Sequence, residues 1–167
     1  MARTRLAVAL LLTLTGAALA LLLLSKHYGV PLLGEAVLAA CGADGGCDIV
    51  SQSRYAVFLS IPLAAWGFIF YGSLAALLVP ALFGKCREES DPGPSLAFLL
   101  CAVAVAIDVF LFGLQLFVIK AFCKFCIATY FVNFLLIASL WPHRRLFGVR
   151  TFLFAPEERR ALAADRK

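Results

Sequence analysis

The sequence predicts an all-α integral membrane protein, built as a four-transmembrane-helix bundle with an extracytoplasmic loop between the first two helices. The 167 residues are 63% hydrophobic and only 15% charged, whereas a soluble domain carries roughly 25% charge. Four long apolar runs follow one another along the chain. The Lys and Arg residues flank these runs, a pattern that orients membrane proteins.

Four segments qualify, or come close to qualifying, as membrane spans. A bilayer core of about 30 Å requires about 20 apolar residues in a helix. The third segment contains one charged residue, Asp108, and the fourth reaches spanning length only if it starts near Phe122. The expected spans, in chain order, are residues 6–24, 61–83, 95–119 and 122–141.

The first apolar run also has features of a secretory signal peptide. Arg3 and Arg5 precede it, and residues 16–20 are small enough to permit cleavage. The run continues through Leu24, however, and is longer than the apolar core of a typical signal peptide. We therefore expect it to remain in the protein as the first span.

The distribution of basic residues predicts that both termini are cytoplasmic. In that orientation the cytoplasmic segments hold 11 Lys and Arg residues and the outer segments hold 4, which fits the positive-inside rule. We expect a multi-pass membrane domain over residues 1–141, in a bacterial inner membrane, and a basic cytoplasmic tail over residues 142–167. The net charge of +5 then reflects topology and contact with lipid, and nucleic acid is not expected as a partner.

Two pairs of cysteines fall on the outer side of this topology. Cys41 and Cys47 lie in the first loop, and Cys123 and Cys126 lie at the start of the fourth span. The topology rests on Lys and Arg alone, yet it places all four thiols on the side of a bacterial membrane that favours disulfides. Two independent signals therefore indicate thiol chemistry at this face.

The Cys123-x-x-Cys126 spacing suits a disulfide that opens and closes. The free N–H groups and the dipole at a helix N-terminus favour a thiolate, and we expect Lys120 and Lys124 to add positive charge nearby. Residues three apart share one helical face. The pair can therefore form and break its bond with little backbone movement.

The loop pair has a different design. Five residues separate Cys41 from Cys47, and three of them are glycines, which relax the backbone. Such a segment can close its own disulfide and then turn one sulfur toward another partner. This design suits a shuttle between a soluble protein and the membrane-embedded pair.

Other interpretations of the polar residues remain open. The four cysteines could hold zinc, although the oxidising side of a membrane disfavours this, so no metal is expected; they could also form static structural disulfides. Cys86 and Cys101 are given no role, because free cysteines are often small buried hydrophobes. Asp108 lies seven residues before Gln115 and serves either to supply protons or, as we prefer, to hydrogen-bond a neighbouring helix.

The sequence resembles the vitamin K epoxide reductase (VKOR) family over about residues 6–141. The segments that carry the resemblance include the loop cysteines, a loop serine and a later Cys-x-x-Cys on the last helix. They are Cys41 to Cys47, Cys47-Asp48-Ile49-Val50-Ser51-Gln52-Ser53-Arg54-Tyr55, Ile61-Pro62-Leu63-Ala64-Ala65-Trp66-Gly67, and Phe122-Cys123-Lys124-Phe125-Cys126 with Thr129-Tyr130. The six-residue offset between the loop cysteines is similar to that of the bacterial branch.

The resemblance implies a four-helix bundle around a quinone (menaquinone or ubiquinone) and a relay of thiol–disulfide exchanges. It implies that Cys47 faces the soluble thiol partner, that Cys41 passes electrons to Cys123, and that Cys126 stands next to the quinone. It also implies a quinone site that includes Ser53 and Tyr130; Trp66 and Phe122 are further candidates, as are Tyr55 and Phe58. Some bacterial members carry a fused thioredoxin-like domain, whereas here we expect the thioredoxin-fold partner, an extracytoplasmic thiol oxidase, to be a separate protein.

The expected function is therefore oxidation of this partner coupled to quinone reduction. The animal branch has an asparagine early in the second span, where this chain reads Leu63-Ala64-Ala65, so epoxide reduction is not predicted as the native activity. Three alternatives remain: a DsbB-like quinone-linked oxidase, in which the order of the two pairs is reversed; the same relay run in the opposite direction; and a membrane scaffold with static disulfides.

Overall fold

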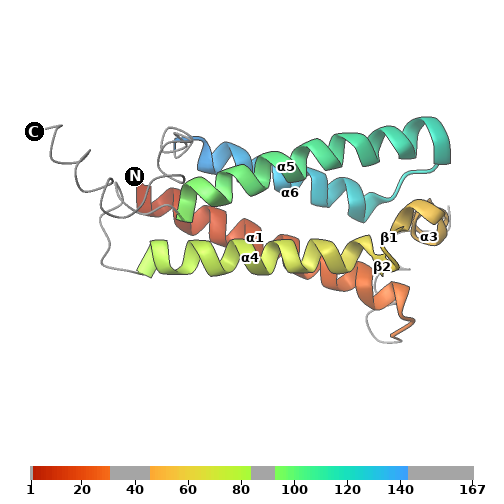
Figure 1. Cartoon of the computed structure of the whole chain (residues 1–167), viewed down its shortest axis with the longest axis horizontal. Helices are drawn as coiled ribbons and strands as arrows, with labels where there is room; N and C mark the ends of the chain where they lie inside the picture. The colour runs from red at the N-terminus through yellow and green to blue at the C-terminus, as the bar shows by residue number, and fades with distance from the viewer. Residues whose placement is uncertain (1, 31–45, 84–92, 143–167) are drawn as a thin grey trace, which may run out of the picture.

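The computed structural model describes residues 2–30, 46–83 and 93–142. Four long helices dominate this part of the chain and run side by side (Figure 1), and a short helix, α3, lies at one end of them. The helices are α1 (Ala2–His27), α3 (Gly46–Gln52), α4 (Leu63–Phe83), α5 (Gly93–Gly113) and α6 (Lys124–Leu140).

The four long helices form a closed ring of neighbours. Helix α1 packs against α4 and α6, and α5 packs against the same two helices. Each long helix therefore has two adjacent partners, as in an up-and-down bundle. Helix α3 lies where α1 ends and where α4 and α6 begin (Figure 1). We call this the cysteine end, because Cys47, Cys123 and Cys126 lie there.

Three of the described helices are long and apolar enough to cross a membrane: Arg3–His27, Leu63–Phe83 and Gly93–Ile119. Helix α6 is equally apolar in character but has only 17 residues. Many of the large apolar side chains on the outside of the bundle are exposed, for example Leu11, Val109 and Phe131. In water such a surface would be costly, whereas lipid solvates it.

The core of the bundle is made of small and branched apolar side chains at helical spacing. Leu74 and Leu78 on α4, like Leu136 and Leu140 on α6, are four residues apart and fully buried. Gly16 on α1 permits a close approach, because a β-carbon there would lie 2.2 Å from Cζ of the Tyr71 ring. A larger residue at this position would displace the Tyr71 ring or push α1 away from α4.

A short hairpin precedes α4. Strands β1 (Val57–Phe58) and β2 (Ile61–Pro62) pair antiparallel, following the single-turn helix η1 (Arg54–Ala56). Leu59 and Ser60 at its tip both have positive φ, as a two-residue hairpin of this twist requires. Because Pro62 belongs to the strand, helix α4 begins at Leu63. This start lies two residues after the start of the predicted span, at residue 61.

Helix α5 changes its winding before it ends. It continues as the π-helix η2 (Leu114–Ile119) and stops at Lys120, which has a left-handed conformation. The chain then runs in a non-helical segment to Cys123, where α6 starts. This segment leads from the end of η2 to the start of α6, where the Cys-x-x-Cys pair lies (Figure 1).

Candidate active site

Two cysteines from distant parts of the chain lie in one buried cluster at the cysteine end. Cys47, in the first turn of α3, and Cys123, just before α6, are 3% and 1% exposed and belong to one buried cluster. Residues from three helices surround this cluster: Leu22, Leu23, Val50, Phe125 and Cys126. We call these seven residues the thiol cluster.

A glycine allows α3 to approach Cys123. Gly46 begins α3, and a β-carbon on it would lie 2.6 Å from the carbonyl oxygen of Phe122. Such a distance is far below van der Waals contact, so the backbone fits only because Gly46 has no side chain. The residue that precedes Cys47 therefore lies against the residue that precedes Cys123.

The structure combines oxidised and reduced cysteines. Cys47 is disulfide-bonded, while Cys101, Cys123 and Cys126 are free thiols. Cys41, the predicted partner of Cys47, lies outside the described residues, as does Cys86. Cys101 is fully buried on α5 in the core of the bundle, where the sequence analysis gave it no role.

Cys123 acts as the N-cap of α6. Its sulfur accepts a hydrogen bond from the backbone N–H of Cys126 at 3.2 Å. Within the helical part, the backbone N–H of Ile127 also bonds to the Cys123 carbonyl. The backbone N–H groups of Phe125 and Cys126, at the start of the helix, both favour the thiolate of Cys123 over its thiol.

The pKa of Cys123 is lowered to about 7. The main cause is a hydrogen bond from the thiol of Cys126, followed by backbone N–H groups at the start of α6 and the charge of Lys26; burial opposes them. A substantial fraction of Cys123 is therefore thiolate at neutral pH, as a sulfur that attacks or leaves in disulfide exchange requires.

Gln115 connects this pair with the rest of the bundle. It is buried in the π-helix, and its side-chain oxygen accepts the backbone N–H of Cys123 at 3.0 Å. Its amide nitrogen donates to the hydroxyl of Tyr130 at 2.8 Å. One side chain on η2 thereby fixes the turn that carries Cys123 and orients Tyr130 on α6.

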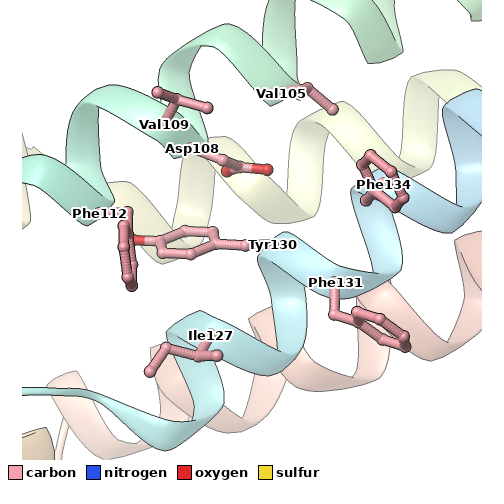
Figure 2. Close-up of a pocket in the computed structure, with 8 residues that line it drawn as sticks. All are labelled: Val105, Asp108, Val109, Phe112, Ile127, Tyr130, Phe131 and Phe134. Carbon is pink, nitrogen blue, oxygen red and sulfur yellow. The ribbon is translucent and has the colours of Figure 1, made fainter.

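A cavity of ≈ 300 Å³ lies between α5 and α6. The first residue of α6 that lines it is Ile127, which directly follows Cys126. Figure 2 shows Asp108 and Phe112 reaching toward it from α5 and Tyr130 from α6. The complete lining is Val105, Asp108, Val109, Phe112, Ile127, Tyr130, Phe131 and Phe134. An apolar wall with a few polar groups is the usual construction of a small-molecule site.

Asp108 belongs to a chain of hydrogen bonds that joins three helices. Its carboxylate accepts from the side-chain nitrogen of Asn133 on α6 at 2.8 Å, and the Asn133 oxygen accepts from the hydroxyl of Tyr71 on α4 at 2.7 Å. This chain of bonds crosses the core of the bundle. The predicted bond from Asp108 to a neighbouring helix is present, and the same carboxylate also faces the cavity (Figure 2).

The other residues expected near a quinone do not line the cavity that Tyr130 lines. Ser53 donates to the carbonyl of Val50 and lines a second, more polar cavity of ≈ 390 Å³ beside α3. Trp66 is 38% exposed and donates to the carbonyl of Phe58 in the hairpin. Phe122 is exposed, and the centroid of its ring lies 6.3 Å from that of Phe112, which lines the first cavity.

Lys26 is a residue of this site that the sequence analysis did not select. It lies in the last turn of α1, forms an ion pair with Asp48 of α3 and is almost completely buried. The two lysines expected to act on the thiols, Lys120 and Lys124, are exposed. The only sequence signal for Lys26 is its position as a charge directly after an apolar run.

The described residues contain no group of three or more His, Cys, Asp or Glu side chains that could hold a metal ion. The chemistry of this part of the chain is that of thiols: a buried disulfide-bonded cysteine, and a second cysteine whose sulfur is capped by a helix. An apolar cavity is lined by residues that follow Cys126 in α6. A bundle of membrane helices with this arrangement defines the class of membrane thiol–disulfide oxidoreductases.

Comparison with known families identifies the member of this class. The model of the vitamin K epoxide reductase family matches residues 7–141, most of the chain, and the protein belongs to that family. The family consists of membrane thiol oxidoreductases that are linked to a quinone and work with a thioredoxin-like redox partner. The resemblance deduced from the motifs is thereby confirmed.

Proposed function

We propose that the protein oxidises a thioredoxin-fold partner on the outer side of a bacterial inner membrane and passes the electrons to a membrane quinone. The observation that carries this proposal is the contact of Cys47, a disulfide sulfur, with Cys123, a free thiol at a helix N-terminus. Two static bridges would not require a thiolate beside an oxidised cysteine. A relay requires this arrangement.

The relay consists of two exchanges and one oxidation. The partner's thiolate attacks the loop disulfide, and a second exchange within the partner releases it oxidised while both loop cysteines become thiols. A loop thiolate then attacks the Cys123–Cys126 disulfide, so that the loop disulfide re-forms and this pair becomes a dithiol. A disulfide at Cys47 with free thiols at Cys123 and Cys126 corresponds to the state after this step.

Burial supports an order of the loop cysteines different from the one that the family resemblance implies. Cys47 is 3% exposed and packs in the thiol cluster with Cys123, so a soluble protein cannot reach its sulfur while α3 is in place. We therefore assign the exchange with Cys123 to Cys47, and the attack by the partner to Cys41. A matched pair of variants tests this order, as described below.

The cavity between α5 and α6 is compatible with a quinone ring. It is lined mainly by apolar and aromatic side chains, and Tyr130 and Asp108 contribute polar groups. Tyr130 lies one helical turn after Cys126, so the two residues share a face of α6. A bound quinone would accept the two electrons and two protons of the dithiol, and Tyr130 and Asp108 would contribute the polar groups of its site.

The first experiment uses cells that lack their own membrane enzyme for disulfide formation but contain a thioredoxin-fold oxidase. The redox state of that oxidase is read by an alkylation gel shift in cells that express wild type or Cys126→Ala. We expect the wild type to restore the oxidised form and the variant to fail. If quinone depletion leaves all cysteine pairs oxidised, the pairs are static bridges and the proposal is wrong.

The order of the loop cysteines is tested by trapping. In Cys126→Ala, the Cys123 thiolate attacks the loop disulfide and forms a mixed disulfide with one loop cysteine, which Cys126 can no longer resolve. Mass spectrometry identifies the linked peptides. We expect a Cys47–Cys123 link, and we expect Cys47→Ala in the same background to lose it. A link between Cys41 and Cys123 that survives Cys47→Ala would restore the order implied by the family resemblance.

A further inference from the structure

A buried positive charge lies next to the thiol cluster. The Lys26 side chain is 10% exposed and its ammonium group is buried, and among the described residues its one polar partner is the Asp48 carboxylate. Its ion-pair partner is Asp48, whose side chain is 40% exposed. A buried ammonium is unfavourable unless nearby anions compensate for its lost hydration.

The positions of these two residues relate the charge to the cysteines. Lys26 follows Leu22 by four residues, so both lie on the same face of α1, and Leu22 packs in the thiol cluster. Asp48 follows Cys47 directly in α3. The ammonium therefore lies between the end of α1 and the start of α3, at the border of the cluster that contains Cys123.

Disulfide exchange creates an anion in this cluster. When Cys123 attacks or leaves, it carries a full negative charge in a site from which water is excluded. A thiolate in such surroundings is unstable unless a positive charge is close. The partly hydrated Asp48 compensates Lys26 only in part, which leaves positive potential available for a second anion.

We propose that Lys26 stabilises the Cys123 thiolate during the relay, and that its ion pair with Asp48 keeps the ammonium against the thiol cluster. Lys26 acts through Cys123 as a positioning residue and touches neither the partner nor a quinone. The proposal rests on the relay described above. It adds that α3, when packed next to Cys123, also holds the Lys26 ammonium near this thiol. The reason is that Asp48, the ion-pair partner of Lys26, directly follows Cys47 on the same helix.

Other charged and titratable groups around Cys123 act differently. Cys126 donates its thiol hydrogen to the Cys123 sulfur and stabilises the thiolate more than any other group. Lys120 and Lys124 are close to Cys123 in sequence, but both are exposed. Lys26 is the cation whose charge lowers the pKa of Cys123. Further groups toward this end are Asp48 and the disulfide-bonded Cys47 on α3, Asp108 on α5 and Tyr130 on α6.

The test measures the Cys123 thiol itself. Full-length protein in lipid nanodiscs is reduced with a phosphine, alkylated at a series of pH values without quinone or partner, and the rate at Cys123 is followed by mass spectrometry. We expect Lys26→Gln to move the midpoint of the rate profile upward by about one pH unit, so that the rate below the midpoint falls about tenfold. Lys26→Arg, which retains the charge, should keep the wild-type profile.

Lys124→Gln is the matched control, because it removes a charge adjacent to Cys123 in sequence but exposed; its profile should equal that of the wild type. An unchanged profile in Lys26→Gln, or an equal shift in Lys124→Gln, would overturn the proposal. The buried Cys101 reports on folding in the same samples, since it is alkylated only when the bundle opens. Where Lys26→Gln exposes Cys101, Lys26→Met, which preserves the aliphatic length, takes its place. The alkylation profile is measured without quinone or partner, so it does not depend on the relay. If the proposed relay is wrong, the gel-shift experiment on the partner oxidase shows it.

Discussion

The carbonyl oxygen of Phe122 lies 2.6 Å from the point that a β-carbon on Gly46 would occupy. This contact joins the backbone before Cys47 to the backbone before Cys123. The two cysteines come from segments far apart in the chain, and the absence of one side chain lets these segments meet. The relay therefore depends on a glycine that has no chemistry of its own.

Replacement of Gly46 by alanine should separate the two cysteines. The added methyl group cannot fit against the Phe122 carbonyl, so α3 must shift away from Cys123. We expect a large loss of the trapped link between the loop and Cys123 in the Cys126→Ala background, measured by mass spectrometry. Gly72→Ala on α4 is the control, since nothing lies within 4 Å of a β-carbon there. Equal yields in the two variants would show that the contact is unimportant.

The reactivity of Cys123 should depend on pH around neutrality. Its pKa is lowered to about 7 from 9.0, so the thiolate is present above about pH 7 and disappears as the pH falls through this value. We expect the alkylation rate of reduced protein to be half-maximal near pH 7. Cys126→Ala removes the strongest stabilising hydrogen bond and should move the midpoint upward toward 9.0. Cys101→Ala, a change in the core, should leave the midpoint unchanged.

Gln115 should be needed both for stability and for turnover. In Gln115→Leu the buried N–H of Cys123 has no acceptor, which costs about 1–3 kcal/mol, and Tyr130 loses its donor. We expect a lower unfolding temperature in detergent and slower quinone reduction. Gln115→Glu retains an acceptor for the Cys123 N–H and should unfold closer to the wild type. A leucine variant as stable as the wild type would contradict this role.

Asp108 should tolerate replacement by asparagine if its role is structural. The asparagine oxygen can still accept the hydrogen bond from Asn133, so Asp108→Asn should retain most of the turnover. Asp108→Leu removes the acceptor and should destabilise the bundle by about 0.6 kcal/mol, the average for hydrogen bonds between membrane helices. Quinone reduction and thermal unfolding are measured for both variants. A stable Asp108→Asn protein without turnover would instead show that the carboxylate carries protons.

The apolar runs were sufficient to predict the helices, because length and hydropathy alone determine what can cross a bilayer. The contacts within the site were less predictable. Gln115 reaches Cys123 and Tyr130 from a π-helix, whose winding moves side chains away from the positions of an ordinary helix. Lys26 is distant from Cys123 in sequence, so inspection of the Cys-x-x-Cys neighbourhood favoured Lys120 and Lys124, whose side chains are exposed in the structure.

The short length of α6 determines the depth of the reactive thiols. At 1.5 Å per residue its 17 residues extend about 26 Å, less than the bilayer core of about 30 Å. Helix α5 reaches further toward the cysteine end, and α3 lies beyond the start of α6 (Figure 1). The free thiols consequently lie beneath α3, away from water. Peroxides and other soluble oxidants should therefore reach this thiolate more slowly than they would reach a thiol at the surface.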